Sequence, residues 1–268
     1  MINTIIFSKD RALQLRLLIE SIKRNAPGMF DIHVLYKASN EDFKKGYEKL
    51  QSENIIPSIT WVEETNFKEQ VLRLLNSDYE YSCFFTDDDI IYGQVFENII
   101  LKEMQDEEVF CFSLRLGLNV NKCYTMNCEN IVKPLEERDN IIKWDWTVHY
   151  MDFGYPLSVD GHIFRTGDIL PLAKNISYHN PNMFEGNLQI FDEYPKNKMV
   201  AFSRSVLVNS PSNIVNDTHP NRKGETFGIA AGELNAKYLN GEIINYDGIS
   251  FENITGCHQE LEYKFIPV

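Results

Sequence analysis

The sequence predicts an α/β protein whose doubly wound, mostly parallel sheet lies between layers of helices. Through the first 116 residues, short apolar runs typical of buried strands alternate with stretches whose apolar residues recur at helical spacing. Polar clusters directly follow two of these runs, at residues 8–11 and 87–89. Sheets of this kind bind ligands at the carboxyl ends of their strands, so both clusters are expected at one ligand site.

The alternation in the first half predicts each element in turn. The predicted strands cover residues 4–7, 31–36, 59–62, 81–86 and 109–114. The predicted helices begin near residues 12, 39, 66 and 96. Asp10 is the expected N-cap of the first helix, and Ser39 with Asp42 matches a capping box for the second. The run at 81–86 is almost continuously apolar, which is typical of a central parallel strand.

The character of the chain changes after residue 116. Residues 117–143 are polar and are expected to be irregular, and an aromatic-rich stretch follows at 144–155. The remaining predicted elements are a return strand at 161–165, a short helix at 168–174, a turn-rich stretch at 178–187 and a helix at 228–239. Because the sequence contains no clear linker, the expected organisation is one domain over residues 1–268, made of two halves at 1–116 and 117–268.

Composition excludes several classes of function. The chain has 26 Lys and Arg against 39 Asp and Glu, a formal net charge of −13. Such a balance disfavours broad binding to nucleic acids or anionic membranes, which requires clustered cations. No apolar run approaches the roughly 18 residues of a membrane span, and the N-terminus does not resemble a signal peptide. The expected location is therefore the cytoplasm. The five cysteines do not have the spacing of a zinc site; Cys83 and Cys111 are expected to be buried and reduced, and a disulfide between Cys123 and Cys128 is the less favoured alternative.

Asp87, Asp88 and Asp89 are the strongest chemical feature. Adjacent carboxylates repel one another unless a cation or water relieves the charge. Alternate residues of a strand face one way, so Asp87 and Asp89 are candidates to share a divalent cation such as Mg²⁺ or Mn²⁺. A solvated acidic turn that caps the next helix is an equally good interpretation of the composition alone.

With these elements in place, the chain resembles the GT-A-fold glycosyltransferases that use nucleotide-diphospho-sugar donors, and in particular glycosyltransferase family 2. The resemblance rests on residues 4–11 with the helix after them, and on residues 83–89, which end in an Asp-x-Asp pattern. It covers residues 1–116 well and the rest loosely. It implies a GT-A-like sheet with a Rossmann-like, nucleotide-sugar-binding half at 1–116 and an acceptor-side half at 117–268.

The resemblance also implies roles for the two polar clusters. Asp87 and Asp89 would hold a Mn²⁺ or Mg²⁺ ion on the donor diphosphate, and Asp88 would contact ribose or the sugar. The base and phosphates would lie along residues of the first cluster, namely Ser8, Lys9, Asp10 and Arg11. The family often has acidic residues after strand two, where this chain has residues 36–39 without one. Taken singly, Lys9 and Arg11 also fit ordinary charges at a helix start.

Glu185 is the candidate catalytic base, with Asp160 in reserve. Inverting members that resemble this chain place an acidic residue at the start of the helix after the return strand. An acceptor hydroxyl must lose its proton as it attacks the anomeric carbon, and a carboxylate can accept that proton. A Glu favoured at a helix N-terminus by the macrodipole is the alternative interpretation.

Histidines and cations near the C-terminus are further candidates. Some GT-A enzymes add a C-terminal histidine to the metal, which makes His258 a candidate ligand, with His219 competing. The loop at residues 217–224 could instead fold over the donor phosphates, with Arg222 and Lys223 as its cations. A surface histidine and a solvated turn are the alternatives.

The predicted function is a metal-dependent, inverting transfer of a hexosyl unit from a nucleotide-diphospho-sugar to a carbohydrate or other hydroxyl acceptor, in surface polysaccharide or glycoconjugate synthesis. Aromatic residues within 144–155 are candidates to stack on the acceptor sugar, although core packing is the commoner role of aromatic side chains. Two alternatives stay open. One is a nucleotidyltransferase or metal-dependent phosphohydrolase on the same sheet, and the other is a non-catalytic relative that binds glycans or partners.

Overall fold

A computed structural model describes residues 1–75, 78–189, 196–215 and 224–268. The helices are α1 (Ala12–Asn25), α2 (Glu41–Glu53), α3 (Phe67–Leu75), α4 (Glu97–Glu103), α5 (Thr166–Asn175), α6 (Pro181–Leu188) and α7 (Ala231–Leu239). The strands of the central sheet are β1 (Ile2–Lys9), β2 (Phe30–Lys37), β3 (Thr60–Glu63), β4 (Tyr81–Thr86), β6 (Val109–Ser113), β9 (Glu136–Arg138), β10 (Ile141–Asp145), β11 (His162–Arg165) and β12 (Lys198–Phe202). Three small pairs complete the strands: β5 (Asp89–Ile91) with β13 (Leu207–Asn209), β14 (Glu242–Ile244) with β15 (Phe265–Pro267), and β7 (Lys122–Cys123) with β8 (Cys128–Glu129).

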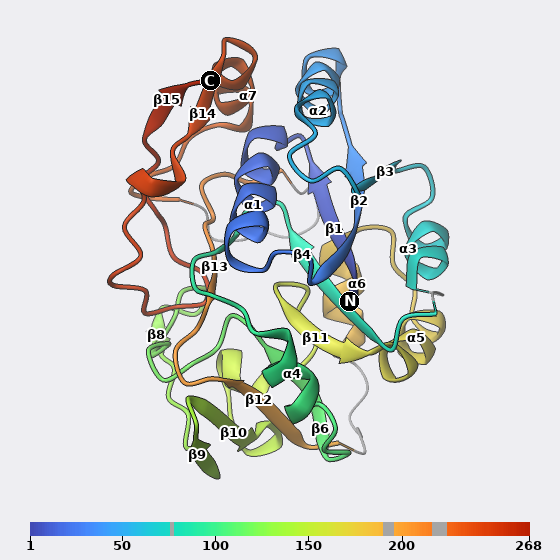
Figure 1. Cartoon of the computed structure of the whole chain (residues 1–268), viewed down its shortest axis with the longest axis vertical. Coiled ribbons are helices and arrows are strands. Elements are labelled where there is room, and N and C mark those ends of the chain that lie inside the picture. Colours follow the sequence, from blue (N-terminus) through green and yellow to red (C-terminus); the bar gives the residue numbers. More distant parts are fainter. Residues whose placement is uncertain (76–77, 190–195, 216–223) are drawn as a thin grey trace.

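The central sheet has the order β3-β2-β1-β4-β11-β6-β12-β10-β9 (Figure 1). Strands β1 to β4 are mutually parallel, and β6 and β12 form another parallel pair. Strand β11 is antiparallel to both of its neighbours, β4 and β6, and β10 is antiparallel to β12 and β9. The predicted α/β class, the mostly parallel sheet and the return strand are confirmed.

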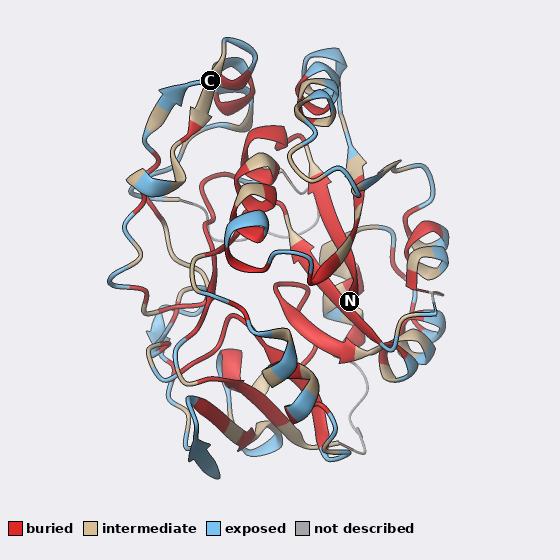
Figure 2. Cartoon of the chain, in the orientation of Figure 1, coloured by how far each residue is buried: buried red, intermediate tan, exposed pale blue. Residues whose placement is uncertain are grey.

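The sheet separates two hydrophobic cores, because successive side chains of a strand face opposite ways. In β1, Ile2 and Ile6 pack on the side of α1, α2 and α7, whereas Ile5 and Phe7 pack on the side of α3, α5 and α6. Both faces are covered, and the central strands are buried along most of their length (Figure 2). This burial explains why their sequences are nearly continuous apolar runs rather than alternating ones.

Two predictions made from the sequence differ from the structure. The second helix is capped by Asn40, whose Oδ1 accepts hydrogen bonds from the backbone N–H groups of Asp42 and Phe43, so the capping box at Ser39 was wrong by one residue. The region 117–143, expected to be irregular, contains β7, β8, β9 and the start of β10. All five cysteines are free.

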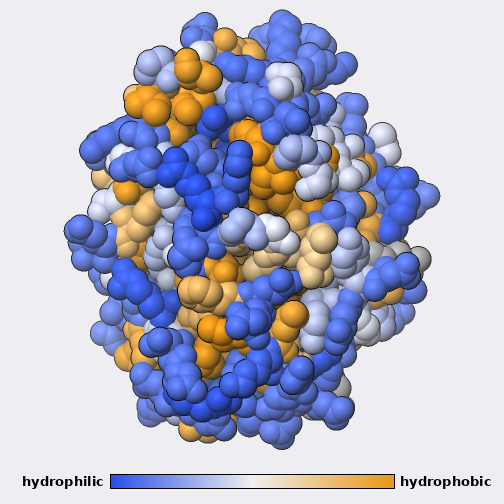
Figure 3. Space-filling view, in the orientation of Figure 1, coloured by the Kyte–Doolittle hydropathy of each residue, from blue (hydrophilic) through white to orange (hydrophobic). Residues whose placement is uncertain are grey.

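The two halves of the chain contribute to one sheet. Strands β9 to β12 come from residues beyond 116 and continue the sheet that β1 to β4 begin. No helix among the described residues is long and apolar enough to cross a membrane. On the face seen in Figure 3, hydrophilic side chains predominate and hydrophobic ones lie in separate patches among them.

Candidate active site

The turn between β1 and α1 has an unusual backbone, which arises at Asp10. Its φ angle is 59°, a left-handed conformation that Asp tolerates better than most residues. The Asp10 N–H donates to Lys37 O at 3.1 Å, and its Oδ1 accepts from Ser39 N at 2.7 Å. Asp10 therefore ties the turn to the segment after β2. The prediction that it caps α1 was wrong, since Arg11 occupies the N-cap position without a side-chain cap.

Arg11 and the acidic turn after β4 form one buried cluster. The guanidinium Nη1 of Arg11 lies 2.9 Å from Asp87 Oδ1 and 2.8 Å from Asp88 Oδ2. The other oxygen of Asp87 accepts from Ser8 Oγ at 2.9 Å and from Lys9 N at 3.0 Å. The two polar clusters predicted from the sequence therefore meet, and the cation between the carboxylates is supplied by the chain itself.

Asp89 points away from this cation and holds the turn together. It is fully buried, and its Oδ2 accepts from the N–H of Thr86 at 2.9 Å. Asn209, which pairs with Asp89 between β13 and β5, donates from Nδ2 to Asp89 Oδ1 at 3.1 Å and to Asp88 Oδ1 at 2.9 Å. Every carboxylate oxygen of Asp87, Asp88 and Asp89 thus accepts a hydrogen bond from the protein.

Burial changes the proton affinity of this cluster. It raises the pKa of Asp87 to about 6, even though the Arg11 charge acts in the opposite direction. Burial also raises the pKa of Asp89 well above its ordinary value, and the nearby charge of Asp160 adds to that rise. Ionised carboxylates at these positions are costly unless the existing hydrogen bonds and the Arg11 contact remain in place.

A cavity of about 700 Å³ opens at the carboxyl ends of β1 and β4, beside the acidic turn. This is the topological switch point of the sheet, where β1 lies between β2 and β4. The sequence-predicted residues in its wall are Ser8, Lys9, Arg11, Asp87, Asp88, Asp160, Glu185 and His258. Asp10 and Asp89 are absent from this wall. Arg222, His219 and Lys223 lie outside the described residues.

Asp160 lies at the centre of a second polar network in the wall. Its Oδ1 accepts from Thr86 Oγ1 at 3.0 Å, and its Oδ2 lies 3.3 Å from Arg115 Nη1 and 3.2 Å from His258 Nε2. Burial opposes ionisation, but the His258 and Arg115 contacts outweigh it and lower the pKa of Asp160 to about 2. The same contact with Asp160 raises the pKa of His258, also against the effect of burial.

Glu185 faces the cavity from within α6, beyond the N-terminal turn of that helix. Pro181 begins α6 and Asn180 caps it, so Glu185 lies beyond the first turn, where the macrodipole effect is small. Its Oε1 accepts from Val159 N at 3.1 Å, which fixes the carboxylate beside the loop that carries Asp160. Burial raises the pKa of Glu185, and the Asp160 charge adds to it, while Arg115 opposes both. A carboxyl with a raised pKa in a cavity is typical of groups that exchange protons during a reaction.

The cavity wall does not offer a ready-made metal site. In the part of the chain that the structure describes, no three His, Cys, Asp or Glu side chains are grouped to hold a metal ion. Asp89 does not reach the cavity, and the Nε2 of His258 is paired with Asp160. The carboxylates of Asp87 and Asp89 and the Nε2 of His258 thus already have protein partners, and metal binding by these three residues stays a prediction.

The aromatic stretch is divided between the core and the cavity. Trp144 and Phe153 are fully buried, and Trp144 Nε1 donates to Phe153 O at 2.9 Å. Tyr155 lines the cavity, whereas Tyr150 is exposed on the surface. Core packing thus accounts for part of the stretch, and Tyr155 is its member at the candidate site.

Some cavity residues were not predicted from the sequence. Arg115 is a charge inside an apolar run directly after β6, a pattern that could have marked it as a buried functional residue. Asn209 gave no such signal, because it reaches Asp88 and Asp89 only through the pairing of β13 with β5.

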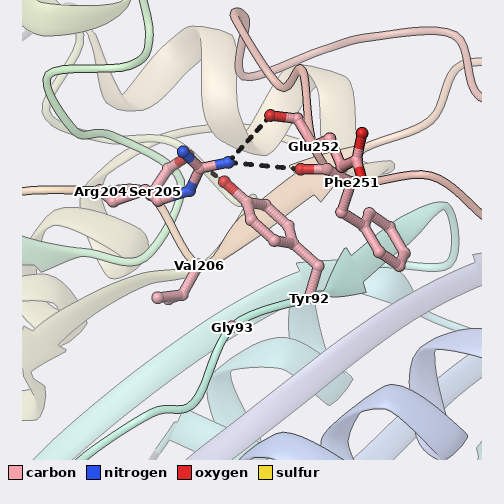
Figure 4. A pocket seen from close by; sticks show the side chains of 7 residues that line it. All are labelled: Tyr92, Gly93, Arg204, Ser205, Val206, Phe251 and Glu252. Carbon is pink, nitrogen blue, oxygen red and sulfur yellow. Dashed lines mark hydrogen bonds between the residues drawn. The ribbon is translucent and has the colours of Figure 1, made fainter.

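A smaller pocket lies apart from this cavity, beside the loop after β5. The guanidinium of Arg204 donates there to the backbone carbonyls of Phe251 and Glu252, while the rings of Tyr92 and Phe251 stack 5.4 Å apart (Figure 4). It contains none of the predicted site residues.

Glu260 anchors the loop that precedes α7. Its carboxylate accepts from the N–H groups of Glu225 at 2.8 Å, Thr226 and Phe227, and from Tyr124 Oη at 2.8 Å. Despite some burial, these bonds lower the pKa of Glu260 to about 2. Their contribution to stability is therefore present above the unfolded pKa of about 4.3 and is lost as the pH falls towards 2.

We expect Glu260→Gln to lower the free energy of unfolding by about 1–3 kcal/mol at pH 7, because charged hydrogen bonds are replaced by weaker ones. The measurement is urea unfolding at pH 7 and pH 3, where the difference between variant and wild type should shrink at the lower pH. The exposed Glu252→Gln is the matched control and should unfold like wild type. An equal difference at both pH values would contradict this account.

Comparisons with known proteins give structural likeness only. No protein-family model and no curated protein sequence matches the chain. Among solved structures, it is similar to TarS of S. aureus (16% identity, 79% of this chain, 37% of that chain, TM-score 0.47). It is also similar to a cytidylyltransferase of Leptospira borgpetersenii (8% identity, 76% of this chain, 76% of that chain, TM-score 0.43). A third similar structure is a mannosyltransferase of Pyrobaculum calidifontis in complex with GDP-Man and Mn²⁺ (14% identity, 41% of this chain, 34% of that chain, TM-score 0.32).

This chain therefore spans little more than a third of the TarS and mannosyltransferase chains. All three TM-scores are below 0.5, a level of likeness that does not establish a shared function.

Proposed function

We propose that this chain is a glycosyltransferase that moves a sugar from a nucleotide-diphosphate donor to a hydroxyl acceptor. The observation that carries the proposal is that two groups line one cavity. The first is the Arg11 cluster at the ends of β1 and β4, and the second is the carboxylate of Glu185 on α6. The first can hold an anionic leaving group and the second can accept a proton, which are the two requirements of the reaction.

The donor's diphosphate would lie against the turn after β1. Arg11 and Lys9 line this part of the cavity and supply its positive charge, which in the case of Arg11 is shared with Asp87 and Asp88. Electrostatic stabilisation of the leaving diphosphate by groups already held in place would be the main contribution of the protein to the rate. Asp88, which also lines the cavity, would accept hydrogen bonds from ribose or sugar hydroxyls.

The acceptor would approach from the side of α6 and the loop that precedes β11. Glu185 would take the proton of the attacking hydroxyl as the new bond forms to the anomeric carbon and the bond to the diphosphate breaks. A base on the opposite side from the leaving group implies inversion at that carbon. Asp160 is held by Thr86, Arg115 and His258 and would stay ionised beside Glu185. Its negative charge would favour the protonated form of Glu185, which is the form that exists after the proton has been accepted.

Dependence on Mn²⁺ or Mg²⁺ remains part of the proposal to be tested. A bound divalent ion would add charge stabilisation at the diphosphate. Because the carboxylate oxygens of the acidic turn already accept hydrogen bonds, an ion there would have to displace some of them. The hexosyl type of the sugar, the division into halves at residue 116, and a role in surface polysaccharide or glycoconjugate synthesis are proposed on the resemblance.

A thermal-shift panel tests the proposal. We expect nucleotide-diphospho-sugars to raise the midpoint of unfolding, as any ligand that binds only the folded state does. Parallel series with Mn²⁺ and with EDTA separate metal-dependent from metal-independent binding. If no nucleotide or nucleotide-sugar shifts the midpoint in either series, the proposed donor is wrong.

A further inference from the structure

The part of the cavity beneath β2 and β3 differs in character from the part around Arg11. Three buried apolar side chains from three separate elements form its wall: Phe7 of β1, Leu35 of β2 and Phe67 at the start of α3. Lys37, the last residue of β2, and Glu64, the residue directly after β3, also line this part of the cavity. An apolar wall with a polar edge suits a flat heterocycle, whose faces are apolar and whose rim carries donors and acceptors.

Glu64 is held in a defined position at this edge. Its backbone N–H donates to Tyr36 O at 2.7 Å, which extends the pairing of β3 with β2 by one residue. Its Oε1 lies 2.9 Å from Lys37 Nζ, and its side chain is only 14% exposed, against 50% for Lys37. Among the described residues, the other oxygen, Oε2, has no hydrogen-bond partner.

A partly desolvated carboxylate with an unused oxygen is a strong acceptor for an N–H group. Hydrogen bonds to charged groups are stronger than those between neutral ones. The rim of a nucleobase offers an N–H donor beside an acceptor, and Glu64 with Lys37 offers the complementary acceptor beside a donor.

We infer that Glu64, positioned by Lys37 and β2, recognises the hydrogen-bonding edge of the donor's nucleobase against the wall of Phe7, Leu35 and Phe67. The inference rests on the proposed function, since it assumes a nucleotide donor whose phosphates lie at Arg11. It names a specificity-determining residue that the sequence did not indicate: residues 38–40, directly after β2, include no acidic one, and the carboxylate at this place directly follows β3.

Isothermal titration of the full chain tests this role. The ligands are UDP, GDP, CDP, ADP and the abasic ribose 5-diphosphate, and the variants are Glu64→Gln and, as matched control, Glu63→Gln. Glu63 is the adjacent exposed carboxylate and does not line the cavity. We expect Glu64→Gln to bind the preferred nucleoside diphosphate about tenfold more weakly and to discriminate less among the bases, with ribose 5-diphosphate unaffected. Glu63→Gln should match wild type for every ligand.

The possible failures are distinguishable. If Glu64→Gln binds all nucleoside diphosphates like wild type, or loses affinity for ribose 5-diphosphate to the same extent, Glu64 does not contact the base and the inference is wrong while the proposed function stands. If wild type binds none of the five ligands, the proposed function itself is wrong. Should Glu64→Gln melt below wild type, Glu64→Asp provides the second variant, since it keeps the charge but withdraws the carboxylate from the base and should show the same selective loss.

Discussion

Glu185→Gln is expected to lower the rate of sugar transfer by a factor of about 10² or more while leaving donor binding unchanged. A positioned general base contributes roughly 10²–10⁴ to a rate, and the amide cannot accept the proton. Its carbonyl oxygen can still accept the hydrogen bond from Val159 N, so the local structure should persist. Steady-state kinetics should therefore show a fall in kcat with little change in the donor KM.

The pH profile separates this role from a structural one. Burial and the Asp160 charge raise the pKa of Glu185, so the acid limb of kcat should lie above the ordinary range of a glutamate, near 4.3. Below that pH the base is protonated and activity is lost, and above it activity is retained. Asp168→Asn, which removes a carboxylate of α5 outside the cavity, is the control and should keep both rate and profile. An unchanged acid limb in Glu185→Gln would mean that another group is the base.

Arg11→Met is expected to destabilise the fold by about 3–5 kcal/mol at neutral pH, the cost typical of removing one partner from a buried ion pair. Arg11 is buried and contacts Asp87 and Asp88, so the variant leaves carboxylates that no longer have their cation. Chemical unfolding at pH 7.5 measures the loss. Arg24→Met, which removes an exposed arginine paired with Glu20 and Asp247, is the control and should cost less than about 1 kcal/mol.

The loss in Arg11→Met should shrink as the pH falls. Burial raises the pKa of Asp87 to about 6, above its unfolded value of about 3.9. The folded state therefore binds the proton more tightly, and ionisation of Asp87 costs stability as the pH rises through this interval. Without Arg11 that cost is larger, so unfolding at pH 5 should show a smaller difference from wild type than at pH 7.5. The same difference at both values would indicate lost packing instead.

The strands and helices of the first half were predictable because each buries its apolar side chains in a simple period. The apolar runs at residues 4–7 and 81–86 lie in β1 and β4. Both strands are buried on both faces, as the composition of the runs indicates. Cap residues were less predictable. Asp10 has the chemistry of a cap, but its left-handed backbone directs its carboxylate to Ser39, which depends on β2 being alongside.

The candidate site was predictable in its position but not in its internal pairing. Both polar clusters follow strands that are neighbours in the sheet, so their meeting followed from the fold class. The position of Arg11 between Asp87 and Asp88 depends on side-chain directions, which the sequence pattern does not give. The contact of Asp89 with Asn209 depends on a strand more than 110 residues further along the chain. Glu64 was missed for a similar reason, because its importance arises only from the pairing of β3 with β2.

The most direct test of the central claim is the identity of the products formed from a nucleotide-diphospho-sugar and a hydroxyl acceptor. Donors labelled in the sugar would be incubated with the full chain, with and without Mn²⁺, and the products separated by mass. The account predicts an intact nucleoside diphosphate and a sugar joined to the acceptor, with the formation of both slowed to the same extent, by about 10² or more, in Glu185→Gln. Release of pyrophosphate or of a nucleoside monophosphate would contradict it and would identify a nucleotidyltransferase or phosphohydrolase instead.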